Sequence, residues 1–230
     1  MGEVADRIRA TIHGAGDPER ARQQQAYMKS ALPFEGLSSP ELRVLLRPIL
    51  AERIAVRSEW AGEALSLWDE ATVREHRYAA IALLEHRYYR EWHDPDLLGI
   101  LRHMVVTGAW WDLVDVIASN LVGDVLARHR ELVTPAMALW AEDDDMWLRR
   151  VAILCQLGDK DETDEELLSQ AITANLEGSR HGSQFFIRKA IGWALRDYAR
   201  TDPDWVRHFV AGRAERLSPL SRREALKHLG

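Results

Sequence analysis

Cysteine is nearly absent from this chain: Cys155 is the only one among 230 residues, so an internal disulfide bond is excluded. Its surroundings, VAILCQL, predict a buried and unreactive thiol. No stretch approaches the roughly 18 uncharged apolar residues that a membrane span needs. The first residues, MGEVADRIRATIHG, also lack the apolar segment of a signal peptide. We therefore expect a cytoplasmic protein, close to the nucleoid if it binds DNA, with no membrane contact.

Several common catalytic signatures are also missing. The sequence has no phosphate-binding P-loop, no dinucleotide fingerprint and no serine-hydrolase elbow. His76, His86 and His93 are spaced by ten and seven residues, which matches no usual pair of metal ligands, so they are expected on solvated helix faces. We predict neither a metal nor a cofactor.

Alternating strand patterns are nearly absent, whereas apolar residues recur every three or four positions, which predicts an all-α protein. Start signals include Ser39 before Pro40 and Asp202 before Pro203. No long linker divides the chain, so a single domain over residues 1–230 is expected. The predicted helices span residues 2–13, 18–31, 40–56, 58–69, 72–87, 94–106, 111–127, 130–140, 144–157, 163–176, 183–199, 203–214 and 219–228.

The net charge is −6, but the charges are unevenly distributed along the chain. From Arg180 to the end there are 11 Lys and Arg against 5 Asp and Glu, whereas residues 1–179 hold 19 against 31. Much of the acid lies in two runs, 142–145 and 159–166, that read as solvated segments. The C-terminal quarter can therefore face a polyanion despite the negative total.

Three segments resemble one another: RYAAIALL from Arg77, RVAIL from Arg150 and RKAIGWAL from Arg188. Their starts are separated by 73 and 38 residues, so a period of 36 to 38 predicts a further copy starting near position 113. This period suits two antiparallel helices with their turns, the unit of HEAT-like solenoids, whose stacked repeats form one concave face. Two residues after each start lie Ala79, Ala152 and Ala190, and the same position of the further copy holds Asp115.

A carboxylate at a position otherwise filled by alanine needs an explanation, since an anion facing other helices must be paired or lie in a wet cleft. One interpretation places Asp115 in the concave face. The other places Asp112 and Asp115 near a helix start, where acids stabilise the helix dipole. The sequence pattern alone leaves both open.

Two of the nine tryptophans stand near charged candidates. Trp111 precedes Asp115 by four residues, so the two side chains share a helix face. Trp193 follows Lys189 by four and lies close to Arg188. Indole rings beside cations suit a nucleic acid or a cationic base. The loop GSRHGS at 178–183 could hold a phosphate, or it could be a turn in which Ser183 caps the next helix.

Taken together, five separated motifs resemble the AlkD family of HEAT-like-repeat DNA glycosylases over nearly the whole chain. The motifs are YMK at 27–29 with PF and Gly36, WWDLVD at 110–115, WLRRVAIL at 147–154, FFIRKAIGWALRDYA at 185–199 and LSPLSRREALKHL at 217–229. This resemblance implies an all-α HEAT-like helical-repeat solenoid with a concave DNA-binding face. It also implies a monofunctional DNA glycosylase that excises N3- and N7-alkylated purines, such as 3-methyladenine and 7-methylguanine, in base excision repair.

By the same resemblance, the catalytic carboxylate falls on Asp115 and the two lesion-flanking indoles on Trp111 and Trp193. The arginine that holds the DNA backbone falls on Arg150, and Tyr27 matches a tyrosine that approaches the DNA. Arg149, Arg188 and Lys189 complete the expected DNA-binding set. The expected partner is double-stranded DNA carrying alkylated purines, bound by a monomer. Members of this family leave the lesion in the base stack, which implies that no base is flipped into a pocket.

A different class of function fits the same helical repeat. A non-catalytic module could grip branched or damaged DNA, or a protein, using only the cationic face. A hydrolase must keep Asp115 and both indoles, as this chain does. The acid runs and the sequence pI of about 5.9 depart from a strongly basic DNA binder.

Overall fold

The computed structural model describes residues 2–229, and within that range every regular element is a helix and none is a strand. The all-α prediction is confirmed, and the succession of short helices is compatible with a helical-repeat solenoid. The described residues form two compact units, one ending at Trp92 and the other beginning at His93. The expectations of one domain over 1–230 and of a concave DNA-binding face stay predictions.

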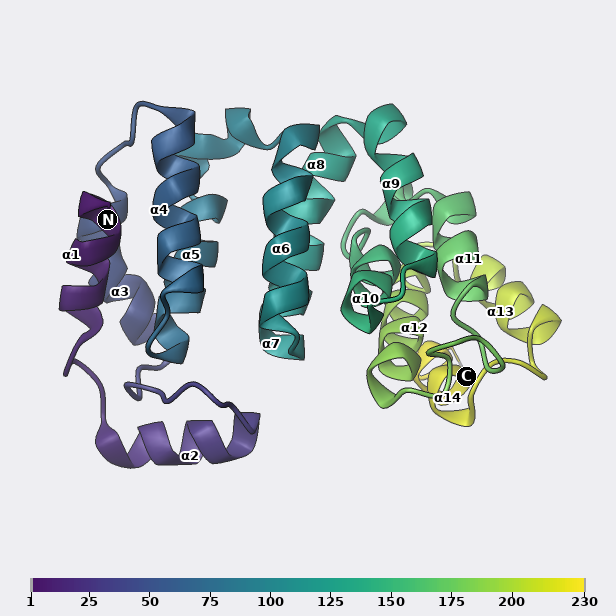
Figure 1. Ribbon diagram of the computed structural model, residues 1–230. Coiled ribbons are helices and arrows are strands. Elements are labelled where there is room, and N and C mark those ends of the chain that lie inside the picture. Colours follow the sequence, from purple (N-terminus) through teal and green to yellow (C-terminus); the bar gives the residue numbers. More distant parts are fainter. Residues whose placement is uncertain (1, 230) are drawn as a thin grey trace. The chain divides into compact units, whose positions relative to one another are not determined.

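The first unit is built around two helices that lie side by side, α4 and α5 (Figure 1). The indoles of Trp60 and Trp68 on α4 are fully buried, and Trp60 Nε1 donates to the carbonyl of Leu83 at 3.2 Å. Burial of such large rings supplies most of the apolar stabilisation of a small helical unit. The helices of this unit are α1 (Glu3–Ile12), α2 (Pro18–Met28), α3 (Ser39–Leu50), α4 (Arg57–Asp69), α5 (Arg74–Glu85) and η1 (Arg87–Trp92).

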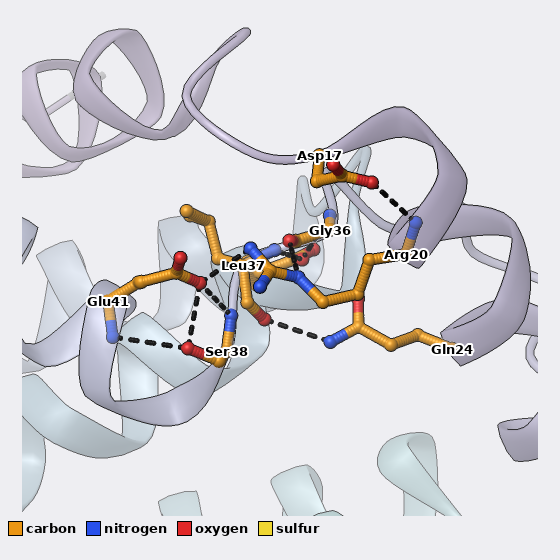
Figure 2. Close-up of polar contacts among 8 residues, drawn as sticks. Asp17, Arg20, Gln24, Gly36, Leu37, Ser38 and Glu41 are labelled. Carbon is orange, nitrogen blue, oxygen red and sulfur yellow. Dashed lines mark hydrogen bonds and ion pairs between the residues drawn. The ribbon is translucent and has the colours of Figure 1, made fainter.

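Helix α2 is held by polar contacts, because its sequence PERARQQQAYM buries only its last residue. Figure 2 shows that Arg20 donates to the carbonyl of Gly36 and, at 2.6 Å, to Glu41, while Gln24 donates to the carbonyl of Leu37 at 2.9 Å. Gly36 has a φ of +89°, and a Cβ there would lie 2.0 Å from the carbonyl oxygen of Asp17. Only glycine allows this approach of the loop to the start of α2.

The loop that follows α2 is fixed by a fully buried carboxylate on α5. Glu75 accepts from the backbone N–H groups of Glu35 at 3.0 Å, Gly36 at 3.0 Å and Leu37 at 3.2 Å. A buried N–H without an acceptor costs about 1–3 kcal/mol, so one side chain replaces the backbone partners that the loop lacks.

We expect Glu75→Ala to lower the free energy of unfolding by about 3 kcal/mol, because three backbone donors lose their acceptor. Glu75→Gln keeps one acceptor oxygen and should cost less. Urea denaturation of both variants measures the difference. The matched control is Glu59→Ala on α4, an exposed first-turn acid whose loss should cost about 1 kcal/mol or less. Equal losses at positions 75 and 59 would contradict the role of the buried carboxylate.

In the second unit, residues 111–128 form one continuous helical run whose middle section is wound as a π-helix. The run packs against α10, and a Cβ on Gly123 would lie 2.7 Å from the carbonyl oxygen of Cys155. This close approach lets the last section of the run pack against the C-terminal end of α10. The elements of this unit are η2 (Pro95–Leu97), α6 (Leu98–Gly108), α7 (Trp111–Val116), η3 (Ile117–Val122), α8 (Gly123–Arg128), α9 (Arg130–Glu142), α10 (Met146–Leu154), η4 (Lys160–Glu162), α11 (Glu165–Thr173), α12 (Phe185–Tyr198), α13 (Pro203–Gly212) and α14 (Pro219–Ala225).

Each predicted helix corresponds in order to an α-helix of the structure or, at 111–127, to the continuous run α7–η3–α8, with corrections at the ends; the short segments η1 and η4 were not predicted. The helix expected at 40–56 ends at Leu50, two residues after Pro48, whose ring cannot continue the backbone ladder. Its N-cap is Ser38 rather than Ser39, whereas Asp202 caps α13 as predicted. The helix η1 was not predicted, because its sequence RYYREW has no helical periodicity.

The repeat positions are helical in all four copies. The three alanines lie on α5, α10 and α12 and are at most 2% exposed, as a small packing residue requires. Asp115 lies on α7, where its side chain is 14% exposed. The predicted repeat therefore places the carboxylate at a largely buried position.

Candidate active site

The candidate site centres on an ion pair between α7 and α10. Arg150 Nε donates to Oδ1 of Asp115 at 2.6 Å and Nη2 donates to Oδ2 at 2.8 Å, so the guanidinium holds both carboxylate oxygens. The third donor, Nη1, donates to the carbonyl of Phe186 on α12. The Arg150 side chain is 5% exposed and that of Asp115 is 14% exposed. A bidentate pair of this kind fixes the orientation of the carboxylate.

The environment of Asp115 shifts its proton affinity in two opposing ways. Burial raises the pKa of Asp115 above its usual value, and the hydrogen bonds and charge of Arg150 offset part of that rise. Asp112, one turn earlier, raises the pKa of Asp115 slightly further. Arg150 is therefore the group that favours the ionised form of this carboxylate.

An aromatic cluster formed by Trp110, Trp147 and Phe186 lies beside Arg150 of the ion pair. The rings of Trp147 and Phe186 are 5.0 Å apart, and that of Trp110 lies 5.4 Å from Phe186 and 6.2 Å from Trp147. The Phe186 ring centre is 6.0 Å from the guanidinium carbon of Arg150. These rings exclude water from one side of the pair, which strengthens its electrostatic interaction. Phe186 was not among the expected site residues, although it lies in the motif FFIRKAIGWALRDYA two positions before a repeat arginine.

The two expected indoles lie on α7, which carries Asp115, and on α12, which carries the carbonyl acceptor of Arg150. Trp111 is the first residue of α7 and is partly buried, one turn before Asp115 on the same face. Trp193 is 36% exposed on α12, seven residues and hence about two turns after Phe186. Helix α12 packs against α10, so one helix contributes both the acceptor for Arg150 and the exposed indole.

Arg149 lies apart from this arrangement. It is 6% exposed, and its guanidinium donates to the carbonyls of Glu142, at 2.8 Å, and Asp143 and to the side chain of Asn175 at 3.3 Å. These contacts tie the end of α9 to the segment after α11. They argue for a structural role, while its expected contact with DNA stays a prediction.

The other expected cationic residues are less buried and are paired with acids. Arg188 donates to Glu177 at 2.9 Å, and Lys189 lies 3.3 Å from Glu224, which also holds Arg196. Gly192 allows α12 to approach α14, since a Cβ there would lie 2.6 Å from the side chain of Glu224. Lys189 thus projects from a rigid pair of helices with 40% of its side chain exposed.

Two further expected features have clear positions. Tyr27 belongs to the first unit, at the end of α2, and is 76% exposed. In the loop at 178–183, Ser183 does not cap α12, because the N-cap is Gln184 and makes no side-chain capping bond. The segment is a turn as one interpretation had it, but the capping role of Ser183 was wrong, and a contact of the loop with a phosphate stays a prediction.

Neither a metal cluster nor a membrane segment is found among residues 2–229. No three His, Cys, Asp or Glu side chains in that range gather as metal ligands would, and no helix there is long and apolar enough to span a bilayer. The expectation of solvated histidines was wrong for His76 and His93, which are 4% and 3% exposed, and His93 is paired with Asp124 at 2.7 Å. Cys155 is 1% exposed, and burial raises its pKa to about 12, which confirms the predicted inert thiol.

Comparison with known proteins identifies the group to which this arrangement belongs. The family described as DNA alkylation repair enzyme matches residues 8–229. The chain belongs to the DNA alkylation repair enzyme family. It is similar to a solved structure described as a predicted DNA alkylation repair enzyme from Enterococcus faecalis, with 33% sequence identity and a TM-score of 0.82, covering 94% of this chain and 97% of that one. No curated protein matches.

Membership of the DNA alkylation repair enzyme family confirms the expected role in repair of alkylated DNA at the level of the family, and this role implies an enzyme that binds DNA. The solved relative confirms the helical fold over nearly all of the chain.

Removing the cation of the pair should change the titration of Asp115. In Arg150→Met the pKa of the Asp115 carboxyl is expected to rise further above its usual value, because burial then acts without an opposing positive charge. Carbon-detected NMR of the side-chain carboxyls measures this shift. The control is Arg102→Met, which removes an arginine paired with Asp143 and should leave Asp115 unchanged. An unshifted carboxyl in Arg150→Met would contradict the pairing.

Proposed function

We propose that the chain is a monofunctional DNA glycosylase that hydrolyses the N-glycosidic bond of N3- and N7-alkylated purines in duplex DNA. The observation that carries the proposal is a largely buried carboxylate, Asp115, held in a fixed orientation by Arg150 in a member of a DNA alkylation repair family.

The chemistry of the substrate explains why one carboxylate suffices. Alkylation at N3 or N7 makes the purine cationic, so the base leaves as a neutral molecule without receiving a proton from the protein. Positive charge then develops on the deoxyribose, as in other glycosidic cleavages that pass through an oxocarbenium-like transition state. An oriented anion stabilises that charge and positions the water that attacks C1′. Asp115 would perform both tasks.

Arg150 acts in this proposal through Asp115, as a positioning residue. Its bidentate contact favours the ionised carboxylate and fixes its orientation, and its Nη1 donates to the carbonyl of Phe186. The AlkD resemblance also assigns Arg150 to the DNA backbone. Only 4% of the Arg150 residue is exposed. A contact with the DNA backbone would therefore require the guanidinium to give up some of its present hydrogen bonds.

Trp111 and Trp193 would line the sugar and exclude bulk water, so that the carboxylate acts in a lower dielectric. The lesion is proposed to stay in the base stack, with catalysis from the backbone side. Such an arrangement admits adducts larger than a methyl group, because no base-sized pocket has to accept them. Arg188, Lys189 and Tyr27 would contact the phosphate backbone or sugars of the duplex, bound by a monomer.

The first test removes the charge of Asp115 and keeps its shape. Asp115→Asn should slow release of 7-methylguanine or 3-methyladenine from methylated duplex by at least about tenfold, or 1.4 kcal/mol of barrier, because the transition state loses its anion. Duplex binding should survive. Single-turnover release assays with a matched Asp112→Asn control on the same helix measure the effect. Equal release by Asp115→Asn and the parent would favour a non-catalytic DNA-binding module.

A second test separates phosphate contacts from positioning. Lys189→Ala should reduce the slope of log affinity against log salt by about one phosphate contact, since an exposed lysine is lost. Arg150→Met should instead slow base release while the salt slope stays near that of the parent. Fluorescence anisotropy with a methylated duplex over a salt series measures both slopes. If Arg150→Met reduced the slope as much as Lys189→Ala does, Arg150 would be assigned to a direct contact with the DNA backbone.

A further inference from the structure

A cavity of about 440 Å³ lies in the second unit, away from the residues assigned to the proposed function. Its two main walls are helices α11 and α13. This volume falls in the range of small-molecule sites, about 300–1,000 Å³. The side chains that matter for its chemistry are those of Glu165 and Glu166 on one wall, and of Trp205 and Phe209 on the other.

The wall formed by α13 is a ladder of flat groups spaced four residues apart. The rings of Trp205 and Phe209 are stacked at 5.0 Å with an interplanar angle of 19°, and the guanidinium carbon of Arg213 lies 3.9 Å from the Phe209 ring centre. Arg213 also donates to Thr173 and Ser169, both at 3.2 Å. This wall therefore already binds one cation at its far end, as the negative face of an aromatic ring favours.

The opposite wall carries two carboxylates without a cationic partner in the described part of the chain. Glu165 accepts from the hydroxyl of Tyr198 at 2.6 Å, and Glu166 accepts from the amide of Gln170 at 3.1 Å. Glu224, by contrast, holds two cations. Burial and Glu165 together raise the pKa of Tyr198 above its ordinary value, so this hydroxyl stays neutral beside the carboxylate.

We propose that this cavity binds a small organic cation, an alkylammonium compound of the polyamine type. One ammonium group would lie between the face of Trp205 and the carboxylates of Glu165 and Glu166. Arg213 would repel a second cation at the Phe209 end, so the ligand occupies the Trp205 end. Two carboxylates without a cationic partner among the described residues and an aromatic ring favour a cation at this place, and the volume suits a small molecule.

Isothermal titration of the full chain with spermidine, at low and physiological salt, tests the site directly. The variant Glu165→Gln with Glu166→Gln removes both charges, and the new amide at 165 still accepts from the Tyr198 hydroxyl. The matched control is Glu131→Gln with Glu215→Gln, two exposed glutamates outside the cavity with the same change in net charge. A third variant, Trp205→Leu, removes the aromatic face. Thermal melting of each variant verifies folding.

The parent is expected to bind one spermidine saturably, and the cavity variant at least about tenfold more weakly, a loss of 1.4 kcal/mol. The control pair should bind as the parent does, and Trp205→Leu should weaken binding by at least about threefold. If both double variants bound spermidine equally more weakly than the parent, diffuse attraction to the negative charge of the chain would explain the binding, and the proposed site would be overturned. Tighter binding of a lysine-rich peptide than of spermidine would overturn the choice of a small molecule. None of these outcomes depends on base release.

Discussion

The Asp115–Arg150 pair is the interaction on which the rest of the second unit's chemistry depends. A carboxylate with 14% of its side chain exposed is unstable as an anion unless a cation compensates for its lost hydration. Arg150 supplies that cation with two parallel hydrogen bonds, and its third donor is used on α12. The pair therefore joins three helices and aims the carboxylate at the same time.

The packing around the pair explains why it can form. The π-wound section after α7 and the close approach at Gly123 set the helical run of Asp115 against α10. The hydroxyl of Ser119 donates to the carbonyl of Asp115 at 2.9 Å, one turn after it and within the π section. π-Helical turns are rare and are frequent at functional sites, because they change the register of side chains within one helix. The π-helical section thus begins two residues after Asp115, next to the carboxylate.

Much of this arrangement could be predicted from sequence, because it rests on periodic patterns. The all-helical fold and the order of the helices follow from apolar spacing, and the repeat register singled out Asp115 against three buried alanines. The partners of buried polar groups could not be predicted, since they come from distant parts of the chain. Glu75 binding a loop 40 residues earlier is one example, and Arg150 donating to the carbonyl of Phe186 is another.

The distribution of charged residues along the sequence was the least informative feature for locating the candidate site. The C-terminal excess of Lys and Arg is partly neutralised locally, since Glu224 binds both Lys189 and Arg196 and Glu177 binds Arg188. The Arg188–Glu177 pair is the more accessible of these, with side chains 33% and 38% exposed, and such a pair contributes little stability and can exchange for contacts with phosphate. Conversely, the acidic run near α11 contributes to a separate cavity rather than to the surface around Asp115. Residue counts alone could not separate these two roles.

The central claim is that Asp115 stabilises positive charge on the sugar, and a pair of duplexes that match in shape and differ in charge tests it without any reaction. One duplex carries a cationic pyrrolidine in place of the deoxyribose at an abasic position, and the other carries the neutral tetrahydrofuran of the same shape. The account predicts that the chain binds the cationic duplex at least about tenfold more tightly, a difference of 1.4 kcal/mol. Equal affinity for the two duplexes would contradict it.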